Sequence, residues 1–247
     1  MILEIAANSV ASALAAQEGG AGRVELCTAL ELGGLTPSHA QIALAREHLR
    51  IPLYVLIRPR AGDFLYSDLE CEMMQRDIET CVALGCDGVV LGVLDADGRV
   101  DTARCRTLIA AAGKLGVTFH RAFDLSRDPA QALEDILALG CERILTSGAQ
   151  ASAPEGEALI RELVVQAAGR LAVMPGAGVT AQNVAALAAA TGAHEFHASA
   201  KRQLPSGMQH WRTRLSDMEA GELRSDVAQV RALVAALQTM AQNPTRI

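Results

Sequence analysis

Hydrophobic and polar positions follow two patterns along this chain, and the patterns take turns from one end to the other. Short apolar runs, typical of buried parallel strands, alternate with longer stretches that have apolar residues at three- and four-residue spacing, typical of amphipathic helices. We expect strands near residues 2–6, 23–27, 53–58, 88–92, 116–120, 143–147, 171–175 and 195–199. We expect helices at Val10–Glu18, Ser38–Glu47, Leu69–Leu84, Thr102–Lys114, Pro129–Leu139, Glu155–Ala168, Ala181–Ala190 and Ser225–Gln242. Eight strand–helix units in alternation predict an α/β fold, the (β/α)8 TIM barrel.

An internal repeat supports this fold. Four segments run from a helix end through a glycine into a strand, and their glycines are Gly20, Gly85, Gly140 and Gly192. Glycine is the expected residue at a helix C-cap. The chain has 247 residues and no Pro/Ser-rich linker, and a TIM barrel has about 250 residues. We therefore expect one domain over residues 1–247, closed by a C-terminal helix at about 225–242.

The repeat also predicts which side chains face the barrel lumen, because side chains alternate between the two faces of a strand. Val24 and Leu26 are the apolar alternates that face the helices, which leaves Glu25 and Cys27 inside. The same alternation places these further side chains in the lumen or at its rim: Glu4, Ala6, Leu56, Arg58, Arg60, Val90, Gly92, His120, Leu145, Ser147, His197 and Ser199.

Glu4, Glu25, His120 and His197 are the candidate catalytic residues in this lumen. Buried charges must pair with one another or with a ligand, since leaving them unpaired costs several kcal/mol. One interpretation is a structural network in which two glutamates pair with two arginines. The other is an active site, because carboxylates and histidines can move protons near neutral pH. These four side chains can also ligate a divalent metal, although no local i, i+3 or i+4 spacing marks a metal motif.

The stretch Phe119–Asp124 joins a predicted strand to three ionisable side chains. His120 is expected to point into the lumen, where polar side chains at the C-terminal ends of parallel strands form the usual sites of this fold. Arg121 and Asp124 fall beyond the strand, so we expect them to brace the rim.

An anion site is the further prediction for this end of the barrel. The segment Pro175-Gly-Ala-Gly-Val-Thr180 follows the seventh strand, and the loops after strands seven and eight often bind phosphate in TIM barrels. A plain tight turn is the alternative for this segment. The candidate anion-binding residues are Asn8, Arg58, Arg60, Ser147, Gly176, Gly178 and Ser199.

Composition narrows the function classes. The formal net charge is −6, and no basic cluster offsets it, which argues against nucleic acid or an anionic membrane as partner. No apolar run reaches the roughly 20 residues of a membrane span. The six cysteines show no C-x-x-C spacing, so reduced thiols in a cytosolic protein are expected.

Several motifs resemble one known family, and they span nearly the whole chain. They are Glu4-Ile-Ala-Ala-Asn-Ser9, Arg23-Val-Glu-Leu-Cys27, Gly33-Gly-Leu-Thr-Pro-Ser38, Ile57-Arg-Pro-Arg-Ala-Gly-Asp-Phe64, Phe119-His-Arg-Ala-Phe-Asp124, Ile144-Leu-Thr-Ser-Gly148, Pro175-Gly-Ala-Gly-Val179 and Glu195-Phe-His-Ala-Ser199. On these motifs the chain is similar to the CutC family. The resemblance implies a cytoplasmic TIM-barrel protein, often a homodimer, that is named for copper homeostasis and described as copper-binding.

Two function hypotheses follow. The resemblance implies a copper-handling protein, with a Cu(I) site that in some relatives uses cysteines at the ends of strands one and two. Cys27 matches the second position, Ala6 occupies the first, and His120 or His197 would complete the site. The residues themselves favour the alternative, an enzyme that acts by acid–base chemistry on a small anionic metabolite, such as a phosphorylated one.

Overall fold

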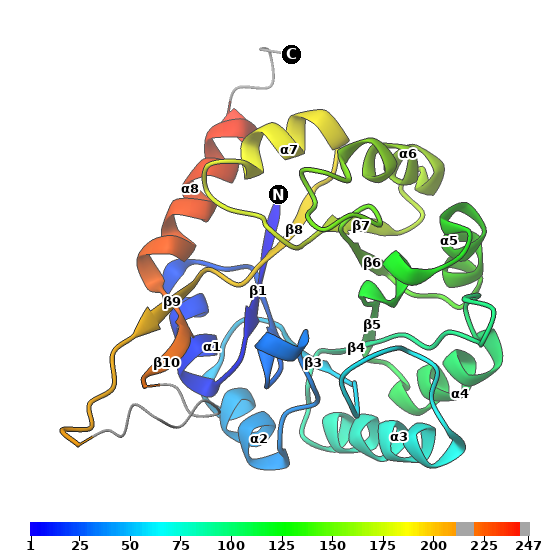
Figure 1. The fold of residues 1–247 in the computed structure, drawn as a ribbon, viewed down its shortest axis with the longest axis horizontal. Coiled ribbons are helices and arrows are strands. Elements are labelled where there is room, and N and C mark those ends of the chain that lie inside the picture. The colour runs from blue at the N-terminus through cyan, green and yellow to red at the C-terminus, as the bar shows by residue number, and fades with distance from the viewer. Residues whose placement is uncertain (211–219, 243–247) are drawn as a thin grey trace.

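The eight apolar runs form one parallel sheet that curves around a central axis, with helices on its outside (Figure 1). The structure is a computed structural model that describes residues 1–210 and 220–242, so the parts of the expected domain at 211–219 and 243–247 lie outside the described residues. The barrel strands are β1 (Ile2–Ala7), β2 (Arg23–Leu26), β3 (Leu53–Leu56), β4 (Gly88–Leu91), β5 (Gly116–Phe119), β6 (Arg143–Thr146), β7 (Ala172–Pro175) and β8 (Glu195–Ala198). The helices are α1 (Val10–Gly19), α2 (His39–His48), α3 (Asp68–Ala83), α4 (Thr102–Ala112), α5 (Pro129–Ala138), α6 (Glu157–Ala167), α7 (Val184–Thr191) and α8 (Val227–Gln242), and two 3-10 turns are η1 (Leu30–Leu32) and η2 (Arg121–Leu125).

The sheet has the strand order of a TIM barrel. Hydrogen-bonded neighbours run β7-β6-β5-β4-β3-β2-β1-β8, and every pair in this sheet is parallel. The ladder stops between β7 and β8, which leaves a seam in an otherwise closed barrel. The predicted fold is therefore confirmed, and the C-terminal helix expected from residue 225 begins at Val227.

Local sequence signals explain where the helices begin and end. Ser38 and Ser67 form capping boxes. Each serine hydroxyl accepts the backbone N–H of the third helical residue, and the side chain of that residue accepts the backbone N–H of the serine. Gly20 and Gly192 cap α1 and α7 with φ angles of 90° and 75°, in the left-handed region that glycine adopts freely. The helices thus end where the repeat predicts.

The apolar core lies between the sheet and the helices. Val24 and Leu26 on β2 are fully buried there, as the strand alternation predicts. A second, smaller apolar cluster fills the lumen and consists of Cys27, Tyr54, Leu56 and Val90. Because side chains alternate so regularly, each barrel strand has one apolar face outward and presents its chemistry inward.

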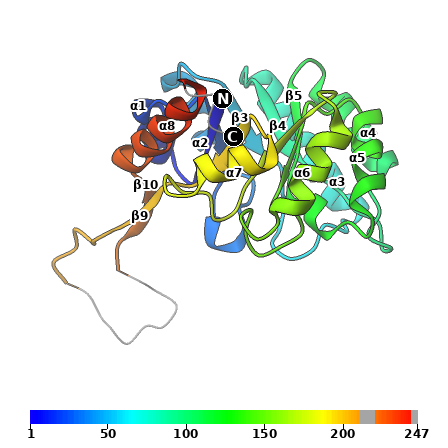
Figure 2. The same ribbon diagram turned by 90° about the horizontal axis from the view of Figure 1, so that it is seen from above.

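A short antiparallel ribbon departs from the expected pattern. Strands β9 (Lys201–Leu204) and β10 (Glu222–Ser225) pair with each other between β8 and α8, beside α1 and away from the barrel strands (Figure 2). The charged segment after residue 200 has no apolar period and was not expected to form strands. Within the described residues no helix has the length and apolar character needed to cross a bilayer.

Candidate functional site

Three polar side chains from neighbouring strands meet inside the lumen. They are Glu4 on β1, Glu25 on β2 and His197 on β8, and the strand register places Glu4 opposite His197 and Ala6 opposite Glu25. Nδ1 of His197 lies 2.7 Å from Oε1 of Glu4 and 3.7 Å from Oε2 of Glu25. One ligand atom from each of the three residues lies within 4.8 Å of the others. The predicted convergence of these side chains is therefore present.

Glu4 is a permanent anion at the base of this group. Its buried carboxylate accepts hydrogen bonds from Nε of Arg23 and from His197. Burial alone would raise the pKa of Glu4, but the charge of Arg23 and the hydrogen bond with His197 outweigh burial and lower it to about 2. Glu4 therefore forms an ion pair of the kind that the structural interpretation expects, with Arg23 rather than Arg58 or Arg60 as its partner.

Glu25 has the opposite protonation behaviour. Burial raises its pKa to about 7, the neighbouring charge of Glu4 adds to this effect, and the charge of His197 opposes it. Its Oε2 is buried and has no hydrogen-bond partner among the described residues. Two adjacent carboxyl groups whose pKa values are pushed apart are typical of acid–base sites.

The two histidines also differ. Burial opposes a charge on His197, but the hydrogen bond with Glu4 and the charges of both glutamates outweigh burial and raise its pKa. His120 lies between β5 and η2, where burial and then the charge of Arg58 lower its pKa to about 3. The surroundings therefore favour the neutral form of His120 and the charged form of His197.

Arg121 and Asp124 brace the rim, as the sequence predicts. Nε of Arg121 donates to Asp124 at 2.7 Å. The same carboxylate accepts the hydroxyl of Thr146 at 2.5 Å and the N–H of Ser147 at 3.0 Å. Asp124 thus ties η2 to the start of the loop after β6.

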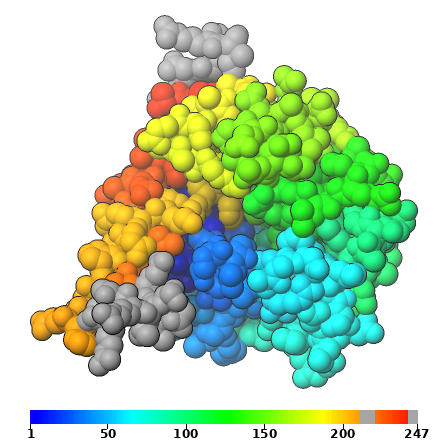
Figure 3. All heavy atoms as spheres, viewed as in Figure 1, coloured from blue at the N-terminus to red at the C-terminus, as the bar shows by residue number. Residues whose placement is uncertain are grey.

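A cavity of about 830 Å³ lies at the C-terminal ends of the strands. Glu25, His120 and His197 form part of its wall, and Lys201 on β9 and Gln229 on α8 reach it from beyond the last barrel strand. The space-filling view shows a hollow at the centre of this face, between the blue, green and yellow segments (Figure 3). A cavity of this size accommodates a small organic molecule.

The loop after β7 contributes unusual backbone to this wall. Ala177 and Gly178 line the cavity with φ angles of 70° and 73°, and Ala200 after β8 lines it with a φ of 44°. Alanine rarely adopts the left-handed region, and such strain is commonly found at functional sites. Ser199, a predicted anion-binding residue, also lines the cavity, between β8 and Ala200.

Gly176 matters because it has no side chain, which lets Leu145 and His197 lie close to its backbone. A Cβ at this position would lie 2.5 Å from Cδ1 of Leu145 and 3.3 Å from Cβ of His197. Any larger residue would therefore push against His197. Gly176 makes room for the histidine, and Gly178 is the glycine of the pair that borders the cavity.

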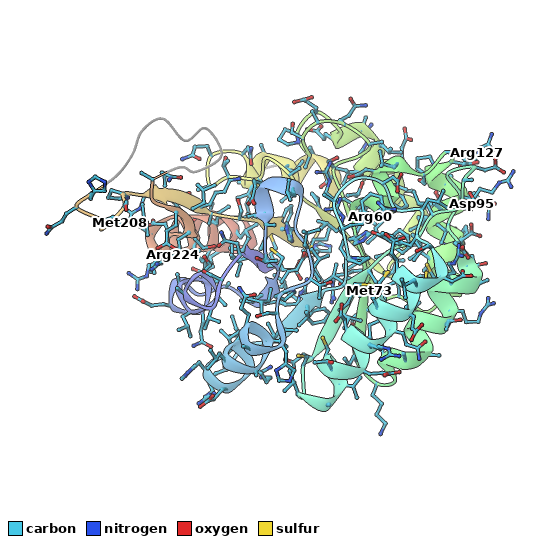
Figure 4. The ribbon with its side chains drawn as sticks, turned by 60° about the horizontal axis from the view of Figure 1, so that its bottom comes forward. Arg60, Met73, Asp95, Arg127, Met208 and Arg224 are labelled. Atoms are coloured by element: carbon cyan, nitrogen blue, oxygen red, sulfur yellow. The ribbon has the colours of Figure 1, made fainter. Side chains whose placement is uncertain are left out.

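The predicted arginines are largely engaged by the protein itself. The guanidinium of Arg58 lines the cavity but donates to the carbonyl oxygens of Leu32, Gly34 and Gly62 at 2.8–2.9 Å. Arg60, labelled in Figure 4, lies on the loop between β3 and α3. It is not part of the cavity wall. It pairs with two carboxylates, at 2.6 Å and 2.9 Å.

Asn8 and Ser147 hold neighbouring segments together. The amide of Asn8 donates to the carbonyl of Leu223 on β10 at 2.8 Å. The hydroxyl of Ser147 lies 2.8 Å from a guanidinium nitrogen of Arg121 and donates to the carbonyl of Gln150 at 2.6 Å. Neither side chain belongs to the cavity wall.

Comparison with known proteins identifies the family. The model of the CutC family matches residues 1–202. This chain belongs to the CutC family. A "family protein CutC" of Xanthomonas campestris pv. campestris (strain B100) is 60% identical over 239 residues, which cover 97% of this chain and 100% of the relative. The copper homeostasis protein cutC homolog of Mus musculus is 49% identical over 207 residues, 84% of this chain and 76% of the mouse protein.

A solved CutC structure shares the fold as well as the sequence. The crystal structure of CutC from Streptococcus agalactiae superimposes with a TM-score of 0.78 at 35% identity, over 81% of this chain and 98% of that one. Thiamine phosphate pyrophosphorylase from Pyrococcus furiosus has a TM-score of 0.61 at 14% identity, which shows the barrel fold alone.

The thiol expected from the CutC resemblance, Cys27, lies apart from the cavity wall. Cys27 is fully buried in the lumen, and its Sγ lies 3.6 Å from the carbonyl of Ala7. Burial, and then the charge of Glu25, raises the pKa of the Cys27 thiol, which opposes the thiolate that binds metal. Ala6 borders the cavity where a second thiol would stand. One sealed thiol is a poor match for Cu(I), which prefers several sulfur ligands.

The structure also shows polar residues that the strand analysis missed. Arg23, Tyr54, Arg143 and Glu195 form the lumen floor, where Arg23 and Arg143 both pair with Glu195, at 2.7 Å and 3.0 Å. Both guanidinium groups lie about 5 Å from the Tyr54 ring, at 5.2 Å and 5.0 Å. Strand alternation also predicts Arg23 in the lumen, because it stands two residues before Glu25 and therefore shares its face of the strand. Strand alternation could not predict Lys201 and Gln229, because both lie outside the eight barrel strands.

Proposed function

We propose that the cavity at the strand ends is an acid–base active site for a small anionic metabolite. The observation that carries the proposal is Glu25. Glu25 is 5% exposed and forms part of the cavity wall, and one oxygen of its carboxyl group has no hydrogen-bond partner among the described residues. A buried carboxyl group of this kind is suited to take a proton from a bound molecule at neutral pH.

The neighbouring groups support that role. Glu4 remains ionised and holds His197 in position, and the charge of His197 stabilises ionised Glu25 from 3.7 Å away. When Glu25 takes a proton from the ligand, the negative charge moves from the carboxylate to the ligand. His197 and the fixed guanidinium of Arg58 then face the new charge, which is the electrostatic stabilisation that enzymes use.

Lys201 is the cation that we assign to the anionic part of the ligand. It is exposed at the cavity and lies next to Ala200, close to the loop that contains Gly178. The chain has one other lysine, Lys114, between α4 and β5 at the opposite end of the barrel. This pair provides a matched test of anion binding.

We expect Lys201→Ala to weaken the binding of inorganic phosphate by about five-fold, the effect of one lost charge-assisted contact near the surface. Titration followed by phosphorus NMR or calorimetry measures this change. Lys114→Ala loses the same charge at the other end and should bind phosphate as the wild type does. Equal affinities in all three proteins would contradict an anion site at this mouth.

Copper binding is the second candidate, and the names of relatives such as the mouse protein favour it. Glu4, Glu25 and His197 offer two oxygens and one nitrogen, a donor set that suits Cu(II) better than Cu(I). Arg23 beside Glu4 opposes any cation there, which is why we rank this function second.

A Cu(I) competition titration tests the thiol. If Cys27 holds copper, Cys27→Ser should lower Cu(I) affinity by about ten-fold or more, because thiolate is the preferred ligand of this ion. Cys71→Ser on α3 is the control, since this half-buried thiol lies on the outer helix layer. Unchanged affinity in Cys27→Ser would remove Cys27 from the copper hypothesis.

We further propose that the protein works in the cytoplasm as a homodimer. Both features are carried over from the family resemblance, and six unpaired cysteines agree with a reducing compartment.

A further inference from the structure

His120 is held in one orientation by groups on every side. Its ring lies 4.8 Å from the ring of Phe64, and a Cβ at Gly92 would come within 2.7 Å of Nδ1. Nδ1 accepts the backbone N–H of Ala122 at 3.2 Å, which makes His120 the N-cap of η2. The side chain is 4% exposed and forms part of the cavity wall.

This contact determines which ring nitrogen carries the proton. A backbone N–H can only donate, so Nδ1 must present its lone pair, and a neutral imidazole then carries its hydrogen on Nε2. The doubly protonated ring would set two N–H groups against each other. The pKa of His120, lowered to about 3 by burial and then by the charge of Arg58, agrees with the neutral form.

Nε2 is therefore a hydrogen-bond donor. The atom is buried, and no acceptor among the described residues lies within hydrogen-bond distance. A buried donor without an acceptor is costly, and such groups in native proteins call for an explanation. Arg58 cannot supply an acceptor, because a guanidinium has only donors.

We propose that Nε2–H of His120 donates to a carbonyl oxygen of the ligand, and to the enolate oxygen that forms when Glu25 removes a proton from the adjacent carbon. This inference rests on the proposed function and names its substrate class, a small anionic carbonyl compound. The C–H electron pair becomes the C=C bond, the carbonyl π pair moves onto oxygen, and the proton resides on Glu25. Return of that proton to carbon completes a reaction that needs no oxidant or reductant.

The geometry excludes other roles for His120. A general base or a metal ligand needs a free lone pair, and here the ring lone pair belongs to Nδ1, where it accepts the N–H of Ala122. A neutral imidazole is also too weak an acid to release its remaining proton at neutral pH. What remains is the preorganised neutral donor, a known means of stabilising a developing oxyanion.

Nitrogen NMR of the full chain labelled with ¹⁵N-histidine tests the tautomer directly. His120, assigned by comparison with His120→Gln, should show a protonated Nε2 and an unprotonated Nδ1, unchanged between pH 5 and pH 8. An Nδ1–H tautomer, or an imidazolium at pH 6, would overturn the inference. The tautomer is read from the spectrum of the wild-type protein, and His120→Gln serves only to assign the signal.

Ligand binding tests the substrate class. The probe is phosphoglycolohydroxamate, which mimics an enediolate and carries a phosphate, and inorganic phosphate is the reference. We expect His120→Phe to weaken the hydroxamate by about ten-fold or more while phosphate binding changes by less than about two-fold, since only the first compound needs the N–H. His120→Gln keeps an N–H donor and should recover part of the loss.

The outcomes separate the two proposals. Equal loss for both compounds, or none in His120→Phe, overturns the role of His120 while phosphate binding dependent on Lys201 stands. Failure of the wild type to bind phosphate would instead contradict the anion site of the proposed function, and failure to bind the hydroxamate as well would overturn the substrate class.

Discussion

When the pH rises from 5 to 8, the free energy of unfolding of a Glu25→Gln variant is expected to increase by about 2 kcal/mol relative to that of the wild type. The pKa of Glu25 is about 7 in the folded protein and 4.5 as its ordinary value. Below pH 4.5 both states bind the proton, so the neutral buried carboxyl is fully tolerated. As pH rises through 7 the folded state must ionise a buried group, and that contribution to stability is lost. Glutamine cannot ionise, so it avoids the loss.

Denaturant unfolding at the two pH values measures the gain, with m-values compared to exclude a change in the unfolded state. The same variant should lose proton transfer, since the amide has no basic oxygen of comparable strength. A residue whose removal stabilises the protein and abolishes its chemistry is the expected signature of a strained active-site group. Equal pH dependence of stability in variant and wild type would contradict the raised pKa.

Glu4→Gln should have the opposite effect, a loss of about 3 kcal/mol at pH 7. The pKa of Glu4 is lowered to about 2 by its partners, despite burial, so its contribution to stability is present above pH 4.5 and is lost as pH falls through 2. The amide also leaves Arg23 buried against Glu195 alone. Breaking a buried pair on one side is among the most destabilising single changes.

The two glutamine variants are controls for each other. Both replace a buried lumen glutamate on neighbouring strands with an isosteric amide, so a general effect of the substitution would have the same sign in both. A comparison of their midpoints of unfolding at pH 7 to 8 shows whether the two effects on stability have opposite signs. If both variants were destabilised equally, the assignment of a structural role to Glu4 and a reactive role to Glu25 would be wrong.

Strand alternation placed Glu4, Glu25 and His197 in the lumen correctly because it depends on one local rule. Once Val24 and Leu26 face the helices, Glu25 must face the lumen, and the parallel register brings it near Glu4 and His197. The same rule, extended by two residues, also reaches Arg23. That residue is the partner of Glu4, a role for which Arg58 and Arg60 were the expected cations.

The roles of the loop residues could not be read from strand alternation. Arg58 and Arg60 stand at the end of β3 like binding residues, but their partners are three carbonyl groups in one case and two acidic side chains in the other. Such contacts depend on how a loop folds back. The same holds for Lys201, which reaches the cavity because the chain continues past the barrel into β9.

Carbon NMR of the Glu25 side-chain carboxyl in the full-length protein, followed from pH 4 to pH 9, tests whether this group can act as the proton acceptor. We expect a titration midpoint near 7, with Glu4 remaining ionised across the same range. A midpoint below pH 5 would show an ordinary carboxylate, and Glu25 would then be one more member of the structural ion-pair network rather than the proton acceptor of an active site.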